Sequence, residues 1–155
     1  MKTDVTKDLK QSRPFANLEH GAQLSIIRTS SMLTDAFERM LKPHGITSTQ
    51  FNVLRILRGA GDTGLCRNEI GDRMITRMPD VTRLLDRMEE AGYIARERST
   101  EDRRMVRTFL ADKGYELLAE IDEEVSTEQR RPFRELSEKQ LEELIEMLAS
   151  VRQNI

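Results

Sequence analysis

Hydrophobic residues recur along most of the chain at intervals of three, four and seven residues, the period of an amphipathic helix. Between residues 18 and 42, for example, one stripe contains Ile26, Leu33 and Phe37. Proline and glycine mark the breaks, so the pattern predicts six helices, at residues 18–42, 48–58, 66–74, 79–91, 112–131 and 137–152. The first helix is long, and its apolar stripe needs a covering surface beyond that of a small domain.

The spacing changes from helical to alternating after Gly92. Residues 93–98 and 105–110 form two short extended runs joined by a polar turn, which predicts a β-hairpin. Two short helices with a turn at residues 75–78 form a helix-turn-helix, and a hairpin directly behind it is a wing. Pro79 is expected at the first position of the second of these helices, where its missing N–H is not needed. The predicted fold is mainly α with a small β-hairpin wing.

The composition excludes several classes of protein, but it does not by itself indicate a function. The chain has 155 residues, of which 37% are hydrophobic, and its single Cys66 excludes an internal disulfide and a cysteine-based zinc site. No nucleophile stands with a base, and no metal-ligand cluster, phosphate loop or cofactor motif is present, so we expect neither an enzyme nor a bound cofactor or metal. No apolar run reaches 18 residues and the first residues are polar, so we expect no membrane partner and a cytoplasmic location.

Charge is distributed unevenly along the chain, although the net charge is only −2. Residues 1–66 carry a net +3, residues 67–107 a net +1 and residues 108–155 a net −6. Between Lys42 and Lys113 there are twelve arginines and no lysine. Arginine suits phosphate and base-edge recognition, but a GC-rich genome also favours it, so this bias alone decides little.

The outward face of the helix at 79–91 carries the candidate DNA-reading residues. A helix-turn-helix places its second helix in the major groove, with the N-terminal residues nearest the bases. Thr82 and Arg83 fit base contact, and Arg77 in the turn could reach a phosphate or a base. The full recognition-helix set is Arg77, Pro79, Asp80, Thr82, Arg83 and Arg87. A solvated helix face of mixed charge remains the alternative.

The predicted wing adds a second candidate surface. Five arginines fall within twelve residues, at positions 96, 98, 103, 104 and 107. We expect Arg98, Arg103 and Arg104 to contact DNA, because arginines inserted into a narrow minor groove add affinity. Asp102 is expected to pair with an arginine and hold the loop in shape. A charged solvent loop is the alternative.

These residues resemble the MarR family of bacterial transcription regulators. The resemblance rests on residues 80–94 (DVTRLLDRMEEAGYI), on Asp102-Arg103-Arg104, on residues 110–114 (LADKG), and on Gly45-Ile46-Thr47 with Gln50-Phe51 and Leu54. Together with the terminal helices, the match covers about residues 18–152. One departure lies at Met78-Pro79-Asp80, where the family often has small hydroxylated residues, so base preference cannot be carried over.

The resemblance implies a homodimer that binds double-stranded DNA. It divides the chain into a mobile N-terminal arm (1–16), a helical dimerisation region (17–45 and 112–155) and a winged helix-turn-helix domain (46–111). Two recognition helices about one DNA turn apart would read a pseudo-palindromic operator. The implied function is repression of a promoter, with release by a small-molecule effector as in many relatives.

Two other functions stay open at this stage. The winged module could bind a protein instead of DNA, although an arginine-rich loop tip argues against this. Cys66 could also make the protein a thiol-based redox sensor, because the N-terminus of the following helix can lower a thiol pKa. An inert, half-buried thiol is the alternative for Cys66.

Overall fold

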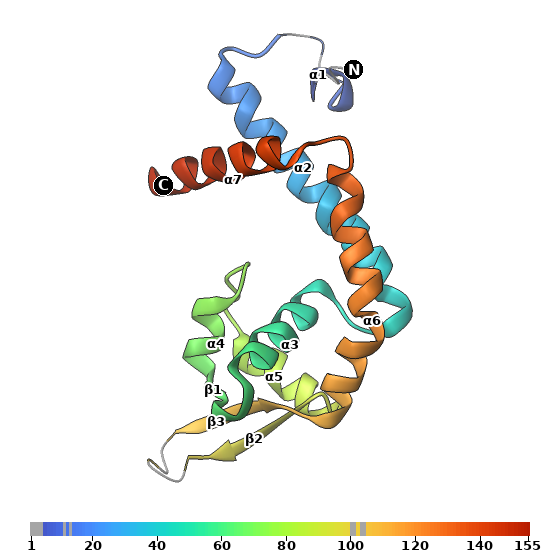
Figure 1. The fold of residues 1–155 in the computed structure, drawn as a ribbon. Helices are drawn as coiled ribbons and strands as arrows, with labels where there is room; N and C mark the ends of the chain where they lie inside the picture. Colours follow the sequence, from blue (N-terminus) through green and yellow to red (C-terminus); the bar gives the residue numbers. More distant parts are fainter. Residues whose placement is uncertain (1–4, 11, 13, 100–101, 103–104) are drawn as a thin grey trace.

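The computed structural model describes residues 5–10, 12, 14–99, 102 and 105–155. Figure 1 shows a winged region (residues 46–111) at one end and two long helices, α2 (Leu18–Leu41) and α7 (Glu138–Gln153), at the other. We call α2 and α7 the outer helices. Helix α6 (Asp112–Arg130) connects the two ends and runs beside α2.

The helices of the winged region follow the predicted order. They are α3 (Ser48–Ala60), α4 (Arg67–Arg73) and α5 (Val81–Glu90). The 3-10 turns η1 (Lys42–His44), η2 (Gly61–Thr63) and η3 (Arg131–Phe133) link longer elements, and α1 (Val5–Asp8) is a single turn near the N-terminus. All six predicted helices are present, with ends that differ by a few residues.

Helices α3 and α7 begin at capping boxes, in which the N-cap residue and the third residue of the helix each accept the other's backbone N–H with a side-chain oxygen. Thr47 accepts a hydrogen bond from the N–H of Gln50, whose side chain accepts from the N–H of Thr47. Ser137 and Gln140 form the same arrangement at the start of α7.

The start of α5 differs from the prediction. The helix begins at Val81 and not at Pro79, and Asp80 is its N-cap. The Asp80 carboxylate accepts a hydrogen bond from the N–H of Arg83 at 3.0 Å. Because aspartate caps an orphan N–H, it sets the helix start two residues later than proline did in the sequence pattern.

The sheet has one strand more than the predicted hairpin. Strands β2 (Ile94–Arg98) and β3 (Val106–Leu110) are antiparallel, and β1 (Leu65–Cys66) pairs with the other edge of β3 in the order β1-β3-β2. Gly64 precedes β1 with φ +59°, and an added Cβ would lie 2.6 Å from the Phe109 ring. Glycine is therefore required where β1 approaches β3.

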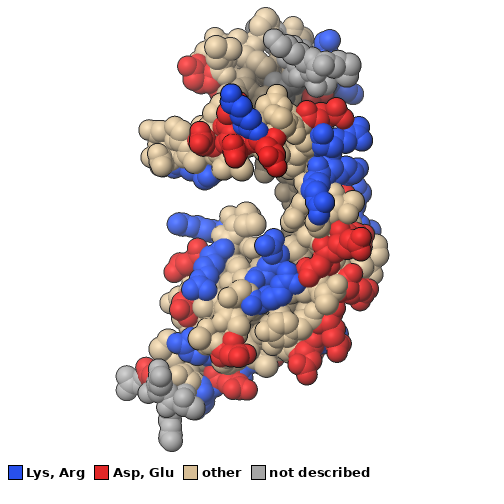
Figure 2. Space-filling model, viewed as in Figure 1, with Lys and Arg blue, Asp and Glu red and all other residues tan. Residues whose placement is uncertain are grey.

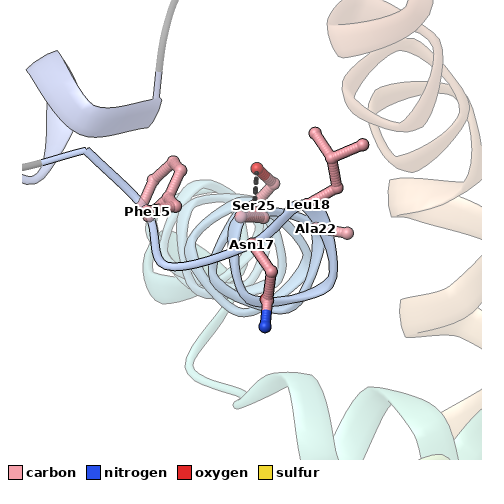
Figure 3. Close-up of a pocket in the computed structure, with 6 residues that line it drawn as sticks. Phe15, Asn17, Leu18, Ala22 and Ser25 are labelled. Atoms are coloured by element: carbon pink, nitrogen blue, oxygen red, sulfur yellow. Dashed lines mark hydrogen bonds between the residues drawn. The ribbon is translucent and has the colours of Figure 1, made fainter.

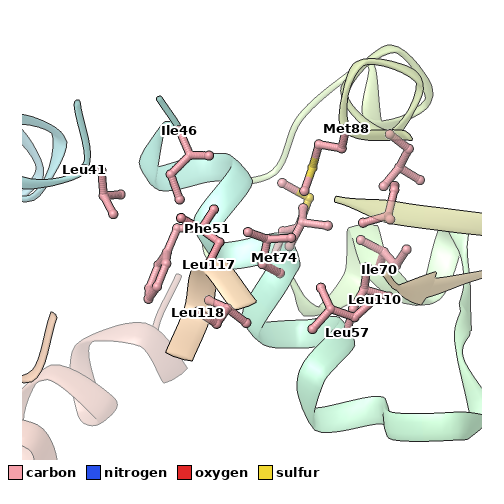
Figure 4. Packing of buried hydrophobic residues seen from close by; sticks show 14 of the residues in the cluster. Leu41, Ile46, Phe51, Leu57, Ile70, Met74, Met88, Leu110, Leu117 and Leu118 are labelled. Carbon is pink, nitrogen blue, oxygen red and sulfur yellow. The ribbon is translucent and has the colours of Figure 1, made fainter. Parts of the chain in front are cut away.

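The hydrophobic core lies inside the winged region and continues into α6. Figure 4 shows Phe51 and Leu57 of α3, Ile70 of α4, Met88 of α5 and Leu118 of α6 pointing toward one another. The first half of α6 is therefore part of the same packed unit as α3.

Side-chain contacts also join α6 to α3 and to the η1 turn. Arg58 donates to both carboxylate oxygens of Asp122 at 2.8–3.0 Å, and His44 contacts Glu124 at 2.9 Å. Bidentate contacts of this kind fix orientation as well as distance. The contact of Arg58 with Asp122 therefore holds α6 at a defined angle to α3.

The outer helices bury little of their apolar surface. Helix α7 has no buried residue, and α2 buries only Leu41, at its C-terminal end. The side chains of Ile145 and Ile27 are 63% and 57% exposed. The apolar stripes that the sequence shows at both ends are therefore only partly covered within one chain.

Candidate nucleic-acid interface

Helix α5 has one face in the core and one face in solvent. Leu85 and Met88 are buried in the winged region, whereas Thr82, Arg83 and Arg87 are exposed. This alternation at helical spacing leaves the predicted DNA-reading side chains free of the core. The structure thus places these three residues on one accessible helix.

The first turn of α5 combines a cap with an ion pair. Besides capping the helix, Asp80 lies 3.6 Å from the Nε atom of Arg83, with side chains that are 54% and 71% exposed. The pair is long and open to water, so it leaves the guanidinium of Arg83 available to another acceptor. The negative charge of Asp80 is partly balanced by Arg83 and by the amide groups of its own helix.

Arg67 is a residue of this surface that the sequence did not indicate. It is the first residue of α4, and its Nη1 atom donates to the Thr82 hydroxyl at 3.2 Å. It also contacts the side chain of its neighbour Asn68, and it has no carboxylate partner among the described residues. The contact joins two residues that are fifteen positions apart on different helices, and only the fold brings them together.

The turn between α4 and α5 is held by a contact from α3. The N–H of Ile75 donates to the Asn52 side chain at 3.0 Å. The side chain of Arg77 is exposed and forms no ion pair with a residue that the structure describes. Arg77 and Arg87 therefore keep a positive charge at the two ends of the exposed face of α5.

Two of the five wing arginines are used inside the protein. Arg96 binds Asp86 at 2.7 Å and Glu89 at 2.5 Å, both on α5. The hydrogen bond with Glu89 is the main cause that raises the pKa of Arg96 above its ordinary value. Arg107 donates to the carbonyl oxygens of Thr63 and Gly64 at 3.1 and 3.2 Å. Neither arginine is free to contact DNA.

Of the remaining wing arginines, the structure describes Arg98 alone. Arg98 is exposed at the end of β2 and has no ion pair within the described part of the chain. Arg103 and Arg104 lie outside the described residues. Asp102 is described, and its backbone closes the turn: its N–H donates to the Ser99 hydroxyl, and its carbonyl accepts from the N–H of Met105 at 2.9 Å. The predicted pairing of Asp102 with an arginine stays a prediction.

The charges of the molecule separate in space. Figure 2 shows Lys and Arg gathered on the side of the winged region that faces the hollow beneath α7, whereas Asp and Glu follow the outer edge along α6. This arrangement agrees with the acidic C-terminal third of the sequence. This face of the winged region therefore presents several positive side chains, with acidic ones among them.

Cys66 lies beside a carboxylate. Its backbone N–H donates to Glu69 at 2.7 Å, and the backbone and thiol hydrogen bonds from Cys66 are the main causes that lower the pKa of Glu69. Reactive cysteines in proteins stand in positive surroundings. The neighbour of this sulfur is negative, which does not support the redox alternative.

Two shallow hollows lie outside the winged region. Figure 3 shows one of 520 Å³ at the start of α2, lined by Phe15, Leu18, Ala22 and other residues. The Ser25 hydroxyl at its edge donates to the carbonyl of Gly21. A second hollow of 320 Å³ lies at the bend between α6 and α7.

The part of the chain that the structure describes also bears on metal binding and on membrane insertion. Within it, no three His, Cys, Asp or Glu side chains stand close enough to hold a metal ion. No helix of that part combines the length and the apolar character needed to cross a bilayer.

Comparison with known proteins identifies the family. A model described as MarR family matches residues 46–106, which cover α3 to the first residue of β3. The chain is also 30% identical to the HTH-type transcriptional regulator MhqR of Bacillus subtilis over 127 residues, 82% of this chain and 86% of that protein. This chain belongs to the MarR family.

Solved structures of MarR proteins share the fold. A MarR transcription factor from Planctomyces limnophilus is 32% identical, with a TM-score of 0.67 over 88% of this chain and 98% of that one. The transcriptional repressor CouR, solved bound to a 23-mer DNA duplex, is 26% identical, with a TM-score of 0.78 over 92% and 99% of the two chains.

Membership of the MarR family settles the class of the protein. It is a DNA-binding transcriptional regulator with the winged-helix fold of that family. The family is one of regulators and not of enzymes, in agreement with the prediction from the sequence.

Proposed function

We propose that the protein is a dimeric repressor that reads a pseudo-palindromic operator through α5 and the wing. The observation that carries this proposal is the exposed face of α5. Arg83 and Arg87 stand there beside Thr82, and Arg77 and Arg98 flank them and form no ion pair with another described residue. Positive charge on a helix-turn-helix matches the phosphates on either side of a major groove.

The residues of this surface divide into two roles. Thr82 and Arg83, near the start of α5, are placed to contact base edges, where arginine binds guanine with two hydrogen bonds. Arg77 and Arg87 are placed to bind phosphates and fix the register. Asp80 sets the start of the helix as its N-cap, Pro79 precedes it, and Asp80 also lies beside Arg83.

The wing takes the flanking minor groove in this proposal. Arg98 belongs to it, together with Arg103 and Arg104 at the tip and with Asp102 as the residue that shapes the turn. Arg67, which bonds to Thr82, joins the surface from α4. Arginine in a narrow minor groove gains from its negative potential.

The dimer is proposed from the uncovered stripes of the outer helices. Residues 17–45 and 112–155 would form the dimerisation region, and residues 46–111 the DNA-binding domain. Exposed apolar stripes on two helices are typical of an interface between subunits. Release from DNA by a small molecule stays a prediction, because the two hollows carry no buried polar group that would select a ligand.

Salt-dependent DNA binding tests this function first. The wild-type protein is titrated on a duplex that it has selected from a random library. Affinity should fall by about 10³–10⁵ between 50 and 200 mM salt if the dimer neutralises 6–10 phosphates.

Substitution at α5 then tests base recognition. Arg83→Ala should weaken binding by about 1–3 kcal/mol and relax base preference at one position in each half-site. The matched control is Arg134→Ala, an exposed arginine between α6 and α7. If Arg83→Ala binds with the same affinity and preference as Arg134→Ala, α5 does not read the bases.

A further inference from the structure

We propose that Arg96 is a positioning residue that fixes the angle between α5 and the wing, so that both reach DNA together. This inference rests on the proposed function, because it assumes that α5 and the wing contact one duplex. Arg96 itself is assigned no contact with DNA. Its role is to keep two DNA-binding elements in register with each other.

The contacts of Arg96 span the joint between these elements. Its Nη2 atom lies 2.7 Å from Asp86 and 2.5 Å from Glu89, and its Nε atom donates to Glu89 at 2.8 Å. The backbone N–H of Arg96 donates to the other oxygen of Glu89 at 3.1 Å. Side chain and backbone of one strand residue are thus both bound by the last two turns of α5.

The sheet register places Arg96 on the face that α5 covers. Arg96 pairs with Thr108, which is 1% exposed, and Ile94 on the same face is 2% exposed. Side chains alternate along a strand, so Arg98 lies on this face two residues nearer the tip. Arg98 is exposed there, whereas Arg96 is 25% exposed. Two arginines on one face therefore have different surroundings.

The contacts of Arg96 with Asp86 and Glu89, which we call the clamp, matter because the wing acts as a lever. The covalent link between α5 and β2 is short and contains Gly92 at φ +81°, and the wing tip begins beyond Arg98. At 3.3 Å per strand residue, Ser99 lies roughly 10 Å past Arg96, so a rotation of about 10° would move it by roughly 2 Å. A shift of that size separates an arginine from a phosphate or groove wall.

Arg96 also controls the charge beside the recognition surface. Asp86 and Glu89 lie on the flank of α5, and their carboxylates would repel DNA if they were unpaired. The guanidinium lies against both of them and neutralises one of the two negative charges. The planar fork of arginine can contact two carboxylates at once, which the single ammonium of lysine does less well.

The experiment compares Arg96→Gln with its matched neighbour Arg98→Gln in the full chain, on the duplex that the wild-type protein selects. Arg98→Gln should lower the salt slope by about 1 per wing, as loss of a phosphate contact does. Arg96→Gln should weaken binding by about two- to thirtyfold, the range of a coupling residue, and should lower the slope because the wing contacts are lost. Hydroxyl-radical protection should then be lost at the flanks and kept at the half-site centres.

Two rescue variants separate positioning from charge and from folding. Arg96→Lys keeps the charge and should restore affinity only in part. The exchanged pair Arg96→Glu with Glu89→Arg puts the cation on α5, next to Asp86, and should recover flank protection. If Arg96→Gln lowers the folding temperature, these two variants still report on the clamp, and failure of the exchanged pair to recover the flanks overturns it.

Other outcomes distinguish the inference from the function beneath it. A reduced salt slope for Arg96→Gln with flank protection kept would make Arg96 a phosphate contact, and wild-type affinity with full flank protection would show that the clamp is not needed. Either result overturns the inference while Arg83→Ala and Arg98→Gln still weaken binding. If those two variants also bind normally, the proposed interface itself is wrong.

Discussion

Both the winged region and the outer helices carry stripes of apolar residues, but they use them differently. In the winged region, Leu54, Leu57 and Ile70 are at most 1% exposed, and side chains of α6 complete the core. In α7 the corresponding stripe leaves Ile145 63% and Val151 47% exposed. Burial of apolar surface is the main stabilising term in folding, so only the first region completes its own stabilisation within one chain.

The difference teaches which contacts are internal and which await a second copy. The winged region also satisfies its polar groups locally, through the Thr47 cap and the clamp at Arg96. Helix α7 has a good cap at Ser137 but no side chain in a core. A helix with a strong start and an uncovered stripe is formed by local signals and positioned by a partner.

A charge in the uncovered stripe should have the largest effect. Ile145→Asp would place a carboxylate in the proposed interface, where burying an unpaired charge is costly. We expect monomers by light scattering and a loss of DNA affinity of about 10²–10⁴, because the two winged regions no longer bind as one unit. The winged region should remain folded by circular dichroism.

Ser150→Asp is the matched control for that change. It adds the same charge to α7 on the side away from the stripe. It should leave both the dimer and DNA binding unchanged. A dimer that survives Ile145→Asp would contradict the assignment of this stripe to the interface.

A cavity in the winged region should come next in size. Leu57→Ala removes a side chain that is 1% exposed and should cost about 2–5 kcal/mol of unfolding free energy. Urea unfolding measures this loss. For Ile145→Ala, in contrast, the loss of unfolding free energy should depend on protein concentration, because an interface side chain stabilises only the dimer. An equal loss at low and at high protein concentration would remove the distinction between the two regions.

The smallest expected effect is a pH dependence confined to the winged region. The Cys66 hydrogen bonds lower the pKa of Glu69 from 4.5, so the ionised carboxylate stabilises the fold above that pH. This contribution is lost as the pH falls through the lowered pKa. Glu69→Gln should therefore lose slightly less stability than the wild type between neutral pH and about pH 3 in urea unfolding. An identical loss in both proteins would contradict the role of Glu69.

Local signals made most of the fold predictable. Helical spacing and the proline and glycine breaks are short-range features, and both predicted elements that the structure contains. Pro79 and Asp80 show the limit of such signals, because both suit a helix start. The structure resolves the competition in favour of Asp80, whose carboxylate bonds to the N–H of Arg83.

The candidate site was less predictable because its contacts cross between elements. In the sequence, nothing in the arginine cluster of the wing indicates that Arg96 binds α5 or that Arg107 binds the η2 turn. Arg67 gives no sign that it meets Thr82. A count of arginines indicates a positive surface, but only the fold separates those that hold the protein together from those that face outward.

Strand β1 was missed for a related reason. Two residues cannot show an alternating pattern, and Leu65 and Cys66 become a strand only because β3 lies beside them. The pairing joins Leu65 to Thr108 and Cys66 to Arg107. No window of sequence short enough to show a period contains both partners.

The central position of β3 has a consequence for the order in which the protein is made. Leu65 leaves the ribosome 43 residues before Thr108, its partner in the sheet. At 5–20 residues per second, the nascent chain waits roughly 2–9 seconds between the two. Helices α3, α4 and α5 are translated with the sheet side of their core still open, and the segment from Met105 to Leu110 closes it. A pause in translation just before this segment would prolong the exposure of Ile70 and Leu85 to chaperones and proteases.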